Sequence, residues 1–415
     1  MTQELQFKYN SLLEEVASGL DISPSKYKQA VDRYKKVSMW ISAGEYEGLG
    51  GEIHCYAQGS FRLGTVVRPI RGGEESGYDI DLVCEFPIIE DGITPEALKI
   101  LIGNRLAENK EYQEMLDEEG RRCWTLLYSE QDGIGFHLDI LPAIPGDPDY
   151  VSVEVGFTQK AIKITHKNKD ESYEWSQSNP SGYADWFEAI NKPTLDLIKA
   201  LHQKRIFENN KGLFARIDDV PEVLIKTPLQ KVIQILKRHR DLRFMNQEFE
   251  DDKPISMIIT TLAARLYQNE ADVFVALNNI VDQLDNLALL LNPEFVLSKS
   301  LQDLELIKRN SDGTWIISNP VNPNENFADR WHENKSSKAR AFFQWVKWVK
   351  EDLIQILNSN DINELSKSLK TSLGEQMVNK ALKSLQLRAA SLSTVVASVP
   401  PRIEISNPNK PWGFE

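Results

Sequence analysis

The spacing of apolar residues changes twice along the chain, and this change limits the fold more than any other feature of the sequence. Apolar residues recur at helical spacing in the first forty residues. They then alternate with polar residues, as in a half-buried strand, in the runs 52–58, 77–86 and 134–144. From about residue 183 onward the helical spacing returns. The pattern predicts an α+β protein in which a small mixed sheet is flanked by helices and joined to a larger helical domain.

The length of 415 residues predicts two or three domains or subdomains. We expect N-terminal helices in residues 1–50, the sheet-bearing unit in residues 51–182 and a helical domain in residues 183–390. The remaining residues, 391–415, contain several prolines and are expected to form an extended arm.

Local signals predict individual elements more finely. Thr94 followed by Pro95 is typical of a helix start and predicts a helix over residues 95–118. Pro193 is expected to interrupt the first helix of the helical domain. Residues 310–330 are rich in Asn, Pro and Gly and predict an ordered loop.

Composition narrows the classes of ligand and the compartment. The chain has 48 Lys and Arg against 61 Asp and Glu, and the net charge of −13 argues against a long track of DNA or RNA on its surface. No stretch approaches the roughly 18 apolar residues of a membrane span, and the N-terminus lacks the apolar core of a signal peptide. Three widely spaced cysteines exclude a disulfide framework and a paired CxxC zinc site. We expect a cytoplasmic globular protein that binds a small ligand and no membrane.

Three aspartates in the strand-like runs form the candidate chemical centre. Asp79 and Asp81 are two positions apart, so their side chains project from the same face of a strand. Such a pair is unfavourable unless a cation or solvent screens it, and taken alone it also fits two solvent-facing acids on an edge strand. Asp139 lies in a similar run and joins the pair if the two strands are neighbours. Three carboxylates on rigid strands suit two Mg²⁺ ions, which prefer oxygen ligands.

Two neighbouring features complete this centre. Gly59 and Ser60 follow a strand-like run, and a Gly-Ser turn before a helix offers N–H groups and a hydroxyl to a phosphate. By itself the pair is only a turn, but its position about twenty residues before Asp79 favours phosphate binding. His137 shares a strand face with Asp139, and we expect it to be a hydrogen-bonded neighbour rather than a metal ligand.

Two stretches are basic although the whole chain is acidic. Residues 60–73 hold three arginines and no acidic residue, which gives a local charge of +3. Residues 222–243 hold six basic and two acidic residues, which gives a local charge of +4. We expect both stretches to lie near an anionic ligand. Lys237 lies at the edge of the apolar stripe of its helix. Because a lysine at such an edge can reach into a cleft beside the helix, we expect Lys237 to contact a phosphate. Arg240 and Arg243 fit a solvated helix face better.

The residues around these candidates resemble the DNA polymerase β-type nucleotidyltransferases, and among them the bacterial cGAS/DncV-like nucleotidyltransferases, or CD-NTases. Three motifs in the family's order carry the resemblance: QGSFRLGT (58–65), YDIDLVCEF (78–86) and HLDILPAIP (137–145). Three later segments are similar to the same family: SNPSGYADWF (178–187), LKRHRD (236–241) and PISMIITTLA (254–263). The resemblance therefore covers most of the chain, including the helical half.

The resemblance implies a function for each matching residue. Asp79, Asp81 and Asp139 match the three acids that bind two metal ions and carry catalysis. The residues that match nucleotide-binding positions are Gln58, Gly59 and Ser60 for the donor phosphates and Lys237 and Ser256 for the terminal phosphates. Apart from the resemblance, Tyr183 is a candidate for stacking on a base, because aromatic faces accept any nucleobase. Core packing explains Tyr183 at least as well, because Trp186 and Phe187 share its helical spacing.

The resemblance also implies a fold and an activity. The fold is a polymerase β-like core joined to a helical domain, with the active site in the cleft between two lobes. The activity is the Mg²⁺-dependent joining of nucleoside triphosphates, ATP among them, into a cyclic di- or trinucleotide second messenger of bacterial anti-phage signalling, with Mn²⁺ as a substitute ion. The implied partners are accessory proteins of the CBASS defence system that act on the C-terminus or as activators.

Two other functions stay open from the sequence. Another polymerase β-type enzyme, which tails RNA or nucleotidylates a small molecule, would use the same acids, although the net charge speaks against an RNA track. A catalytically silent nucleotide-binding regulatory protein would keep the same fold. The three intact acids speak against it, because a silent site has no physical need to hold them together.

Overall fold

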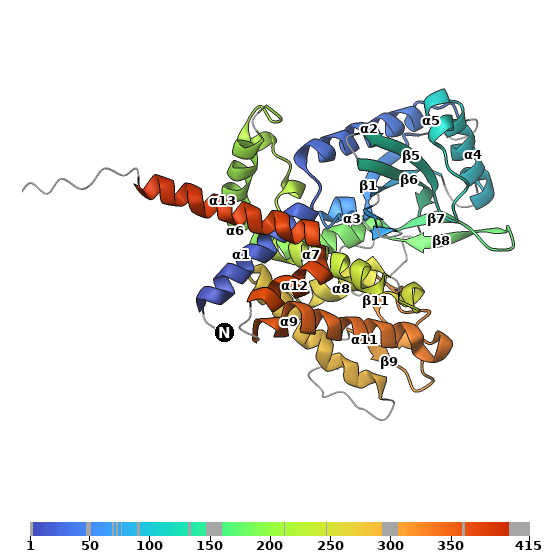
Figure 1. The fold of residues 1–415 in the computed structure, drawn as a ribbon. Coiled ribbons are helices and arrows are strands. Elements are labelled where there is room, and N and C mark those ends of the chain that lie inside the picture. Colours follow the sequence, from blue (N-terminus) through green and yellow to red (C-terminus); the bar gives the residue numbers. More distant parts are fainter. Residues whose placement is uncertain are drawn as a thin grey trace, which may run out of the picture.

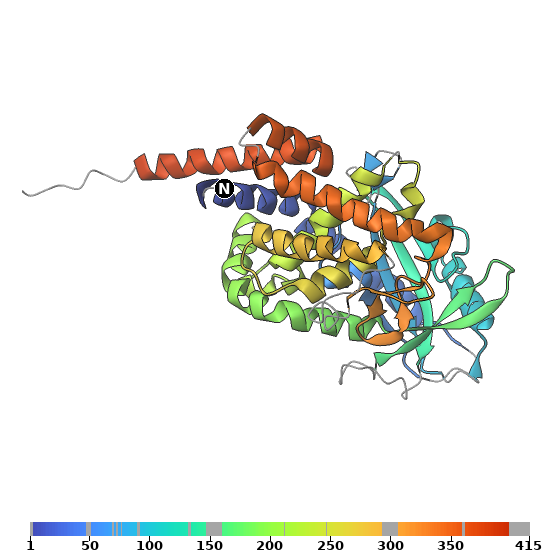
Figure 2. The same cartoon turned by 90° about the horizontal axis from the view of Figure 1, so that it is seen from below.

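A β-sheet with its covering helices forms one lobe of the molecule, and a group of long helices forms the other (Figure 1). The two lobes also lie side by side in the view from below (Figure 2). The computed structural model describes residues 3–46, 51–68, 70–71, 74–75, 77–88, 92–131, 134–146, 160–210, 212–245, 247–292, 306–358 and 362–397. Within these ranges, no helix combines the length and the apolar character that crossing a membrane requires.

The sheet has six strands, which are β1 (His54–Gln58), β4 (Tyr78–Glu85), β5 (Trp124–Gln131), β6 (Ile134–Pro145), β7 (Ile162–Lys167) and β8 (Tyr173–Ser178). Their order is β1-β4-β6-β7-β8, and β5 also pairs with β6. Strands β4 and β6 are parallel, whereas the other pairs are antiparallel, so the sheet is mixed as predicted. The predicted runs correspond to β1, β4 and β6, while β5, β7 and β8 are additional. A separate two-stranded pair consists of β2 (Ile70–Arg71) and β3 (Glu74–Glu75).

The helices of the sheet lobe are α2 (Pro24–Ser42), α3 (Gly59–Leu63), α4 (Pro95–Ala107) and α5 (Lys110–Met115). The side chain of Thr94 caps α4 by accepting a backbone hydrogen bond, which confirms the predicted helix start. The single helix predicted over 95–118 is two helices. Asn109 separates them, because its side chain accepts hydrogen bonds from the backbone N–H groups of Glu111 and Tyr112 and starts α5.

The helices of the other lobe are α1 (Gln3–Leu20), α6 (Pro180–Asn209), α7 (Pro228–Phe244), α8 (Ser256–Leu266), α9 (Val273–Asn286), α11 (Glu333–Leu353), α12 (Ile362–Leu373) and α13 (Glu375–Ala397). Helix α7 lies at the centre and packs against α1, α8, α9, α11 and α12. Helix α1 packs on α7 and α13, whereas α2, the next helix along the chain, packs on β1 and β4. The first two helices therefore connect the lobes.

Three details of the helical lobe differ from the sequence-based expectation. Pro193 lies inside α6 instead of interrupting it. The helix tolerates it there because Pro193 and Ala189, whose carbonyl loses its helical donor, are both exposed to water. Helix α13 continues to Ala397, past the expected start of the C-terminal arm at residue 391, and residues 398–415 lie outside the described part of the chain.

The third difference is in the predicted loop at residues 310–330, which forms two hairpins. Strand β9 (Lys308–Arg309) pairs with β10 (Trp315–Ile316), and β11 (Ser318–Asn319) pairs with β12 (Asn322–Asn326). The side chain of Asn326 replaces missing backbone pairs, because its amide donates to the Trp315 carbonyl and its oxygen accepts from the Ile317 N–H. Such side-chain bonds are not visible as a strand pattern in the sequence.

The core of the helical lobe depends on α7. Its predicted apolar stripe, Leu229, Val232, Ile233 and Leu236, is buried among the neighbouring helices. A second hydrophobic core joins the sheet to α2 and α4. Because the two cores are separate, each lobe has its own packed interior, and the lobes meet along a boundary where polar residues gather.

Replacing one buried leucine of α7 tests this arrangement. We expect Leu229→Ala to lower the free energy of unfolding by about 2–5 kcal/mol, because the side chain is fully buried and its loss leaves a cavity. The matched control is Leu197→Ala on α6, where the leucine is 85% exposed and the change should stay below about 0.5 kcal/mol. Urea unfolding of both variants measures the difference, and equal effects would contradict the central position of α7.

Candidate active site

A cavity of about 940 Å³ lies between the two lobes, near the upper end of the volumes usual for small-ligand sites. All nine residues predicted for the site line it, namely Gln58, Gly59, Ser60, Asp79, Asp81, Asp139, Tyr183, Lys237 and Ser256. They come from β1, α3, β4 and β6 on the sheet side and from α6, α7 and α8 on the helical side. The fold thus brings together residues that are up to about two hundred positions apart in the sequence.

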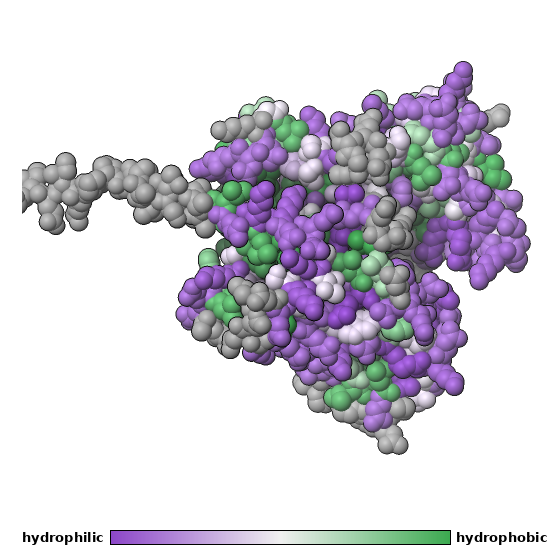
Figure 3. Space-filling view, in the orientation of Figure 1, coloured by the Kyte–Doolittle hydropathy of each residue, from purple (hydrophilic) through white to green (hydrophobic). Residues whose placement is uncertain are grey.

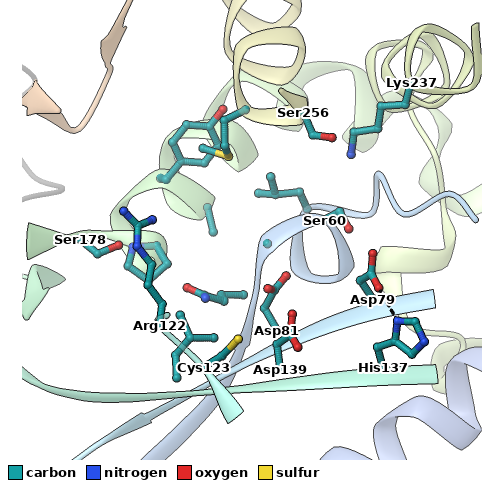
Figure 4. A pocket seen from close by; sticks show the side chains of 18 of the residues that line it. Ser60, Asp79, Asp81, Arg122, Cys123, His137, Asp139, Ser178, Lys237 and Ser256 are labelled. Carbon is teal, nitrogen blue, oxygen red and sulfur yellow. Dashed lines mark hydrogen bonds and ion pairs between the residues drawn. The ribbon is translucent and has the colours of Figure 1, made fainter. Parts of the chain in front are cut away.

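The three aspartates lie on two neighbouring strands and point toward the same opening (Figure 4). In the parallel pair of β4 and β6, Asp81 lies opposite Asp139, and Asp79 lies opposite His137. Thr125 Oγ1 on β5 donates a hydrogen bond of 2.6 Å to Asp139 Oδ1, and His137 Nδ1 lies 3.1 Å from Asp79 Oδ1 as its donor. His137 is therefore a hydrogen-bonded neighbour of an acid, as predicted.

The acids are electrostatically unfavourable without a cation. Burial raises the pKa of Asp81 to about 7, and the charges of Asp139 and Asp79 act in the same direction, while the charge of Lys237 opposes them. Burial also raises the pKa of Asp139, against the hydrogen bond from Thr125. Each carboxylate thus disfavours the ionised form of its neighbours, and a bound cation would relieve the repulsion.

The donor set fits a hydrated Mg²⁺ ion better than a closed metal cage. Among the residues that the structure describes, no three His, Cys, Asp or Glu side chains form a ready-made metal cluster. Mg²⁺ does not require one, because it keeps several waters and binds through one or two carboxylates together with substrate phosphates. The oxygen ligands of Asp79, Asp81 and Asp139 on an open face suit this mode of binding, for Mg²⁺ or Mn²⁺.

Gly59 is required by the close approach of the Asp81 carboxylate. Its φ of +64° is a conformation that favours glycine, and a Cβ at this position would overlap Asp81 Oδ2. The residue starts α3 directly after Gln58, which lies opposite Asp81 in the pair of β1 and β4. The next side chain, Ser60, points into the opening between the acids and Lys237 (Figure 4). The turn therefore places a hydroxyl opposite the acids with no side chain between them.

The helical wall of the cavity carries Lys237 and Ser256 (Figure 4). Lys237 Nζ donates to the carbonyl oxygen of Thr65 at 3.0 Å and to its hydroxyl at 3.3 Å, and burial lowers the pKa of the lysine to about 7. Ser256 Oγ accepts a hydrogen bond of 3.1 Å from Arg240 Nη1. Both polar groups are thus held in place on the side of the cavity that faces Ser60.

The prediction of a solvated face for Arg240 and Arg243 is wrong. Arg240 lines the cavity and forms an ion pair of 2.7 Å with Asp241, and Arg243 donates to Asp352 at 2.6 Å. The reason is that other helices surround α7 on nearly all sides, so Arg240 also reaches Ser256 at the start of α8, and Arg243 reaches Asp352 on α11.

Two of the three arginines at residues 60–73 do not line the cavity, contrary to expectation. Arg62 pairs with Asp185 at 3.6 Å, and Arg68 pairs with Glu75 at 2.8 Å, and neither arginine lines the cavity. The side chain of the third arginine, at position 71, lies outside the described residues. The cations on the helical wall are Lys237 and Arg240 from α7 and Lys253 from the segment before α8.

Several lining residues were not found by the sequence analysis, among them Arg122, Cys123, Thr125, Ser178, Asn179, Asn319, Glu325 and Phe327. Arg122 and Ser178 lie on the side of the cavity away from Lys237 (Figure 4). The first five lie in or beside β5 and β8, which were not predicted, and the last three belong to the hairpin region at 310–330. The run WTLLYSE was the one available signal, because its β-branched and aromatic residues favour a strand.

Tyr183 serves the core as well as the cavity wall. Its hydroxyl and that of Thr261 are 2.8 Å apart, and its ring centroid lies 5.2 Å from that of Trp186. The side chain is buried. The packing interpretation of this residue is therefore confirmed, and stacking on a base stays a prediction.

Comparison with known proteins finds relatives along nearly the whole chain. Residues 54–142 match the family model for the nucleotidyltransferase domain of proteins like the cyclic GMP-AMP synthase DncV. A c-di-GMP synthase of Roseivirga ehrenbergii is 25% identical over 386 residues, which cover 92% of this chain and 89% of the relative. The cyclic dinucleotide synthase CdnG of Bradyrhizobium diazoefficiens is 23% identical over 392 residues, which cover 91% of this chain and 83% of the relative.

Solved structures share the fold. The structure of Bradyrhizobium diazoefficiens CdnG in complex with GTP superimposes with a TM-score of 0.64 at 21% identity, covering 91% of this chain and 99% of that one. The structure of E. coli CdnC with ATP gives a TM-score of 0.56 at 15% identity, covering 88% of this chain and 97% of that one. These matches confirm the predicted fold class.

The geometry around Gly59 predicts a specific failure of Gly59→Ala. We expect at least about a tenfold loss of Mg²⁺-dependent nucleotide binding, measured by calorimetry, because the new Cβ must displace Asp81 Oδ2. Gly212→Ala is the matched control, since Gly212 has a φ of +92° and no atom within 4 Å of an added Cβ. It should lower the melting temperature slightly through backbone strain of about 1 kcal/mol and leave binding unchanged. Normal binding by the Gly59 variant would disprove the close approach.

The metal-free protein should lose stability as the pH rises from about 4 to 7 through Asp81. The unfolded chain releases this proton near 3.8, whereas the folded chain holds it until about 7, so the folded state binds more protons in that window and stability falls with rising pH. Melting temperatures in EDTA measure the effect, and Asp81→Asn should flatten the slope. Parallel curves for the two proteins would contradict the assigned burial of this carboxylate.

Proposed function

We propose that this chain, a member of the CD-NTase family with a DncV-like nucleotidyltransferase domain at residues 54–142, joins nucleoside triphosphates into a cyclic dinucleotide. The observation that carries the proposal is the meeting of three strand-borne acids with a Gly-Ser turn in one cavity between the lobes. The two relatives are named for syntheses of this kind, one as a c-di-GMP synthase and the other as a cyclic dinucleotide synthase.

The reaction is two successive nucleotidyl transfers. A ribose hydroxyl of one nucleotide attacks the α-phosphate of another, so that one P–O bond forms, the bond to pyrophosphate breaks, and the hydroxyl proton is released. The linear product then turns in the cavity, and its free hydroxyl attacks the remaining α-phosphate, so that the ring closes, a second pyrophosphate leaves and the hydroxyl proton is released. No covalent enzyme intermediate is needed, because positioning and electrostatic stabilisation lower the barrier.

Asp79, Asp81 and Asp139 would hold the divalent ions, two Mg²⁺ with Mn²⁺ as a substitute. When bound, the ions would neutralise charge on the phosphate oxygens and lower the pKa of the attacking hydroxyl. The chain contributes fixed positions: β4 and β6 set the register of Asp81 and Asp139, and Thr125 orients the Asp139 carboxylate from β5. We assign Asp139 to the activation of the attacking hydroxyl and to the acceptance of its proton.

The triphosphate would lie between the turn and the helical wall. Ser60 and the backbone N–H groups of its turn bind phosphate oxygens from one side, and Lys237 and Ser256 bind them from the other. A nearby triphosphate raises the pKa of Lys237 and keeps the lysine charged, which offsets its burial. The acidic total charge of the chain is compatible with an anionic substrate because these groups act locally.

We place the product in signalling rather than in metabolism. A cyclic dinucleotide made in the cytoplasm would act as a second messenger in anti-phage defence, with CBASS accessory proteins as activators or as enzymes that modify the C-terminus. The family resemblance supports this role, and the relative CdnC of E. coli has been solved in complex with a HORMA protein. The C-terminal residues 398–415 lie outside the described residues.

Incubation of the protein with the four nucleoside triphosphates and Mg²⁺, without any acceptor, tests the proposal. We expect a phosphatase-resistant product with the mass of a cyclic dinucleotide that contains guanine, because the relatives are named for c-di-GMP or were solved with GTP. Product formation only with added RNA or a small-molecule acceptor would favour another polymerase β-type enzyme. A complete lack of pyrophosphate release would favour the silent regulatory protein.

The double substitution Asp79→Ala with Asp81→Ala should abolish Mg²⁺-dependent product formation, a loss of at least about 1,000-fold, because no ligand on β4 would then hold a metal. The melting temperature should stay near normal, since the change removes a repulsive pair. Asp218→Ala, on an exposed residue outside the cavity, is the matched control and should keep full activity. Full turnover by the double variant would refute the assignment of these acids.

A further inference from the structure

The hairpin of β11 and β12 brings a fixed carboxylate to the cavity wall. Asn319, Glu325 and Phe327 from this region line the cavity. Asn319 Nδ2 donates to Glu325 Oε2 at 2.7 Å, while Asn319 Oδ1 accepts from the Val321 N–H at 3.0 Å. Because both ends of the Asn319 amide are used, the side chain has one orientation, and this orientation holds the Glu325 carboxylate in place.

The hairpin itself is anchored in the helical lobe. The Asn326 side chain, next to Glu325, accepts from the N–H groups of Ile317 and Ala328 and donates to the carbonyl of Trp315. Trp315 is buried, and its ring lies 5.8 Å from Trp331 in an edge-on arrangement. These contacts fix the backbone on which Glu325 lies. A residue that recognises a ligand requires such a fixed position.

One oxygen of the Glu325 carboxylate is available to a ligand. Oε2 accepts the hydrogen bond from Asn319, whereas no side chain or backbone group of the described residues donates to Oε1. Glu325 is partly exposed, and its open side is the cavity, so Oε1 can accept hydrogen bonds from a ligand there. Burial raises the pKa of this carboxyl, and the hydrogen bond from Asn319 and the charge of Arg122 act against the increase.

The acids of the catalytic centre do not explain this carboxylate. Asp79, Asp81 and Asp139 influence one another, whereas the charged groups that influence Glu325 are Arg122 and Asp329. The charge of Glu325 also contributes to raising the pKa of the Tyr183 hydroxyl. Glu325 thus belongs to a second polar region of the same cavity, together with an arginine and an aromatic ring.

We infer that Glu325 selects guanine in a bound nucleoside triphosphate by accepting hydrogen bonds from N1–H and the 2-amino group of the base. This inference rests on the proposed function, since it names the base that the site takes. Guanine is the one standard base with two adjacent donors on its Watson–Crick edge. Adenine and cytosine place a ring-nitrogen acceptor beside their amino group, and uracil has acceptors on both sides of its donor, so a carboxylate repels all three.

Neighbouring residues suit the same base. Arg122, two residues before β5, extends into the cavity (Figure 4). An arginine is a common partner of the O6 and N7 acceptors of guanine. Phe327 and Tyr183 also line this cavity, and aromatic side chains support a base by stacking. The surface view shows mostly hydrophilic residues over the visible face of both lobes, with hydrophobic residues in small separate groups (Figure 3).

Binding of non-hydrolysable analogues of GTP, ITP and ATP to the full-length protein tests this inference without turnover. Hypoxanthine, the base of ITP, keeps O6 and N1–H but lacks the 2-amino group. We expect the wild-type protein to bind the GTP analogue about 10- to 100-fold more tightly than the ITP analogue, the range for one hydrogen bond to a charged group. Equal affinities would overturn the inference with no variant needed.

Glu325→Gln then assigns the effect to the residue. Glutamine has the same size but offers one acceptor and one donor, so the ratio of GTP to ITP affinity should fall to near 1 while the melting temperature stays unchanged. Glu248→Gln, on an exposed glutamate outside the cavity, is the matched control and should keep the wild-type ratio. A folded Glu325 variant that keeps the wild-type ratio would overturn the inference.

The outcome is separable from that of the proposed function. If the protein forms no cyclic product but discriminates between GTP and ITP through Glu325, the inference stands and the proposed reaction fails. If the wild-type protein forms a cyclic product and Glu325→Gln leaves the base preference unchanged, the reaction stands and the inference fails.

Discussion

Mutual repulsion between three carboxylates on two adjacent strands is the constraint on which the rest of the site depends. The parallel register of β4 and β6 sets Asp81 opposite Asp139, and burial raises the pKa values of both. A sheet that gathers acids in this way is unfavourable until cations bind, which couples the site to metal and to phosphate. The neighbouring structure follows from the same constraint: Gly59 lacks a side chain where Asp81 needs room, and Thr125 and His137 donate hydrogen bonds to two of the acids.

Under the proposed function, the two lobes would divide the recognition of a nucleotide between them. The sheet side supplies the acids and the Gly-Ser turn, and the helical side supplies Lys237 from the central helix α7. The hairpin next to α11 adds Glu325, whose pKa is affected by the charges of Arg122 and Asp329 and not by the three aspartates. A ligand that is anionic at one end and carries a patterned hydrogen-bonding edge at the other would contact both lobes at once, and a nucleoside triphosphate has this shape.

The sequence predicted the chemical centre better than its surroundings. Asp79, Asp81 and Asp139 could be predicted because they occupy the polar positions of alternating runs, a pattern that the pleat of a strand determines. The contacts of Arg240 with Ser256 and of Arg243 with Asp352 could not be predicted, because these partners lie on α8 and α11, and the sequence between Pro228 and Phe244 does not indicate which helices pack around it. Glu325 was missed for a related reason: its hairpin is held by Asn319 and Asn326 side chains, in a segment whose composition indicates a loop.

The central claim is that the acids of β4 and β6 bind the metal ions of nucleotidyl transfer. A crystal of the protein with Mn²⁺ and a non-hydrolysable GTP analogue measures this directly, through the anomalous scattering of manganese. We expect manganese peaks between the carboxylates of Asp79, Asp81 and Asp139 and the phosphates of the analogue, which would extend toward Ser60 and Lys237. An analogue bound in the cavity with manganese elsewhere, or with none at these three acids, would contradict the claim.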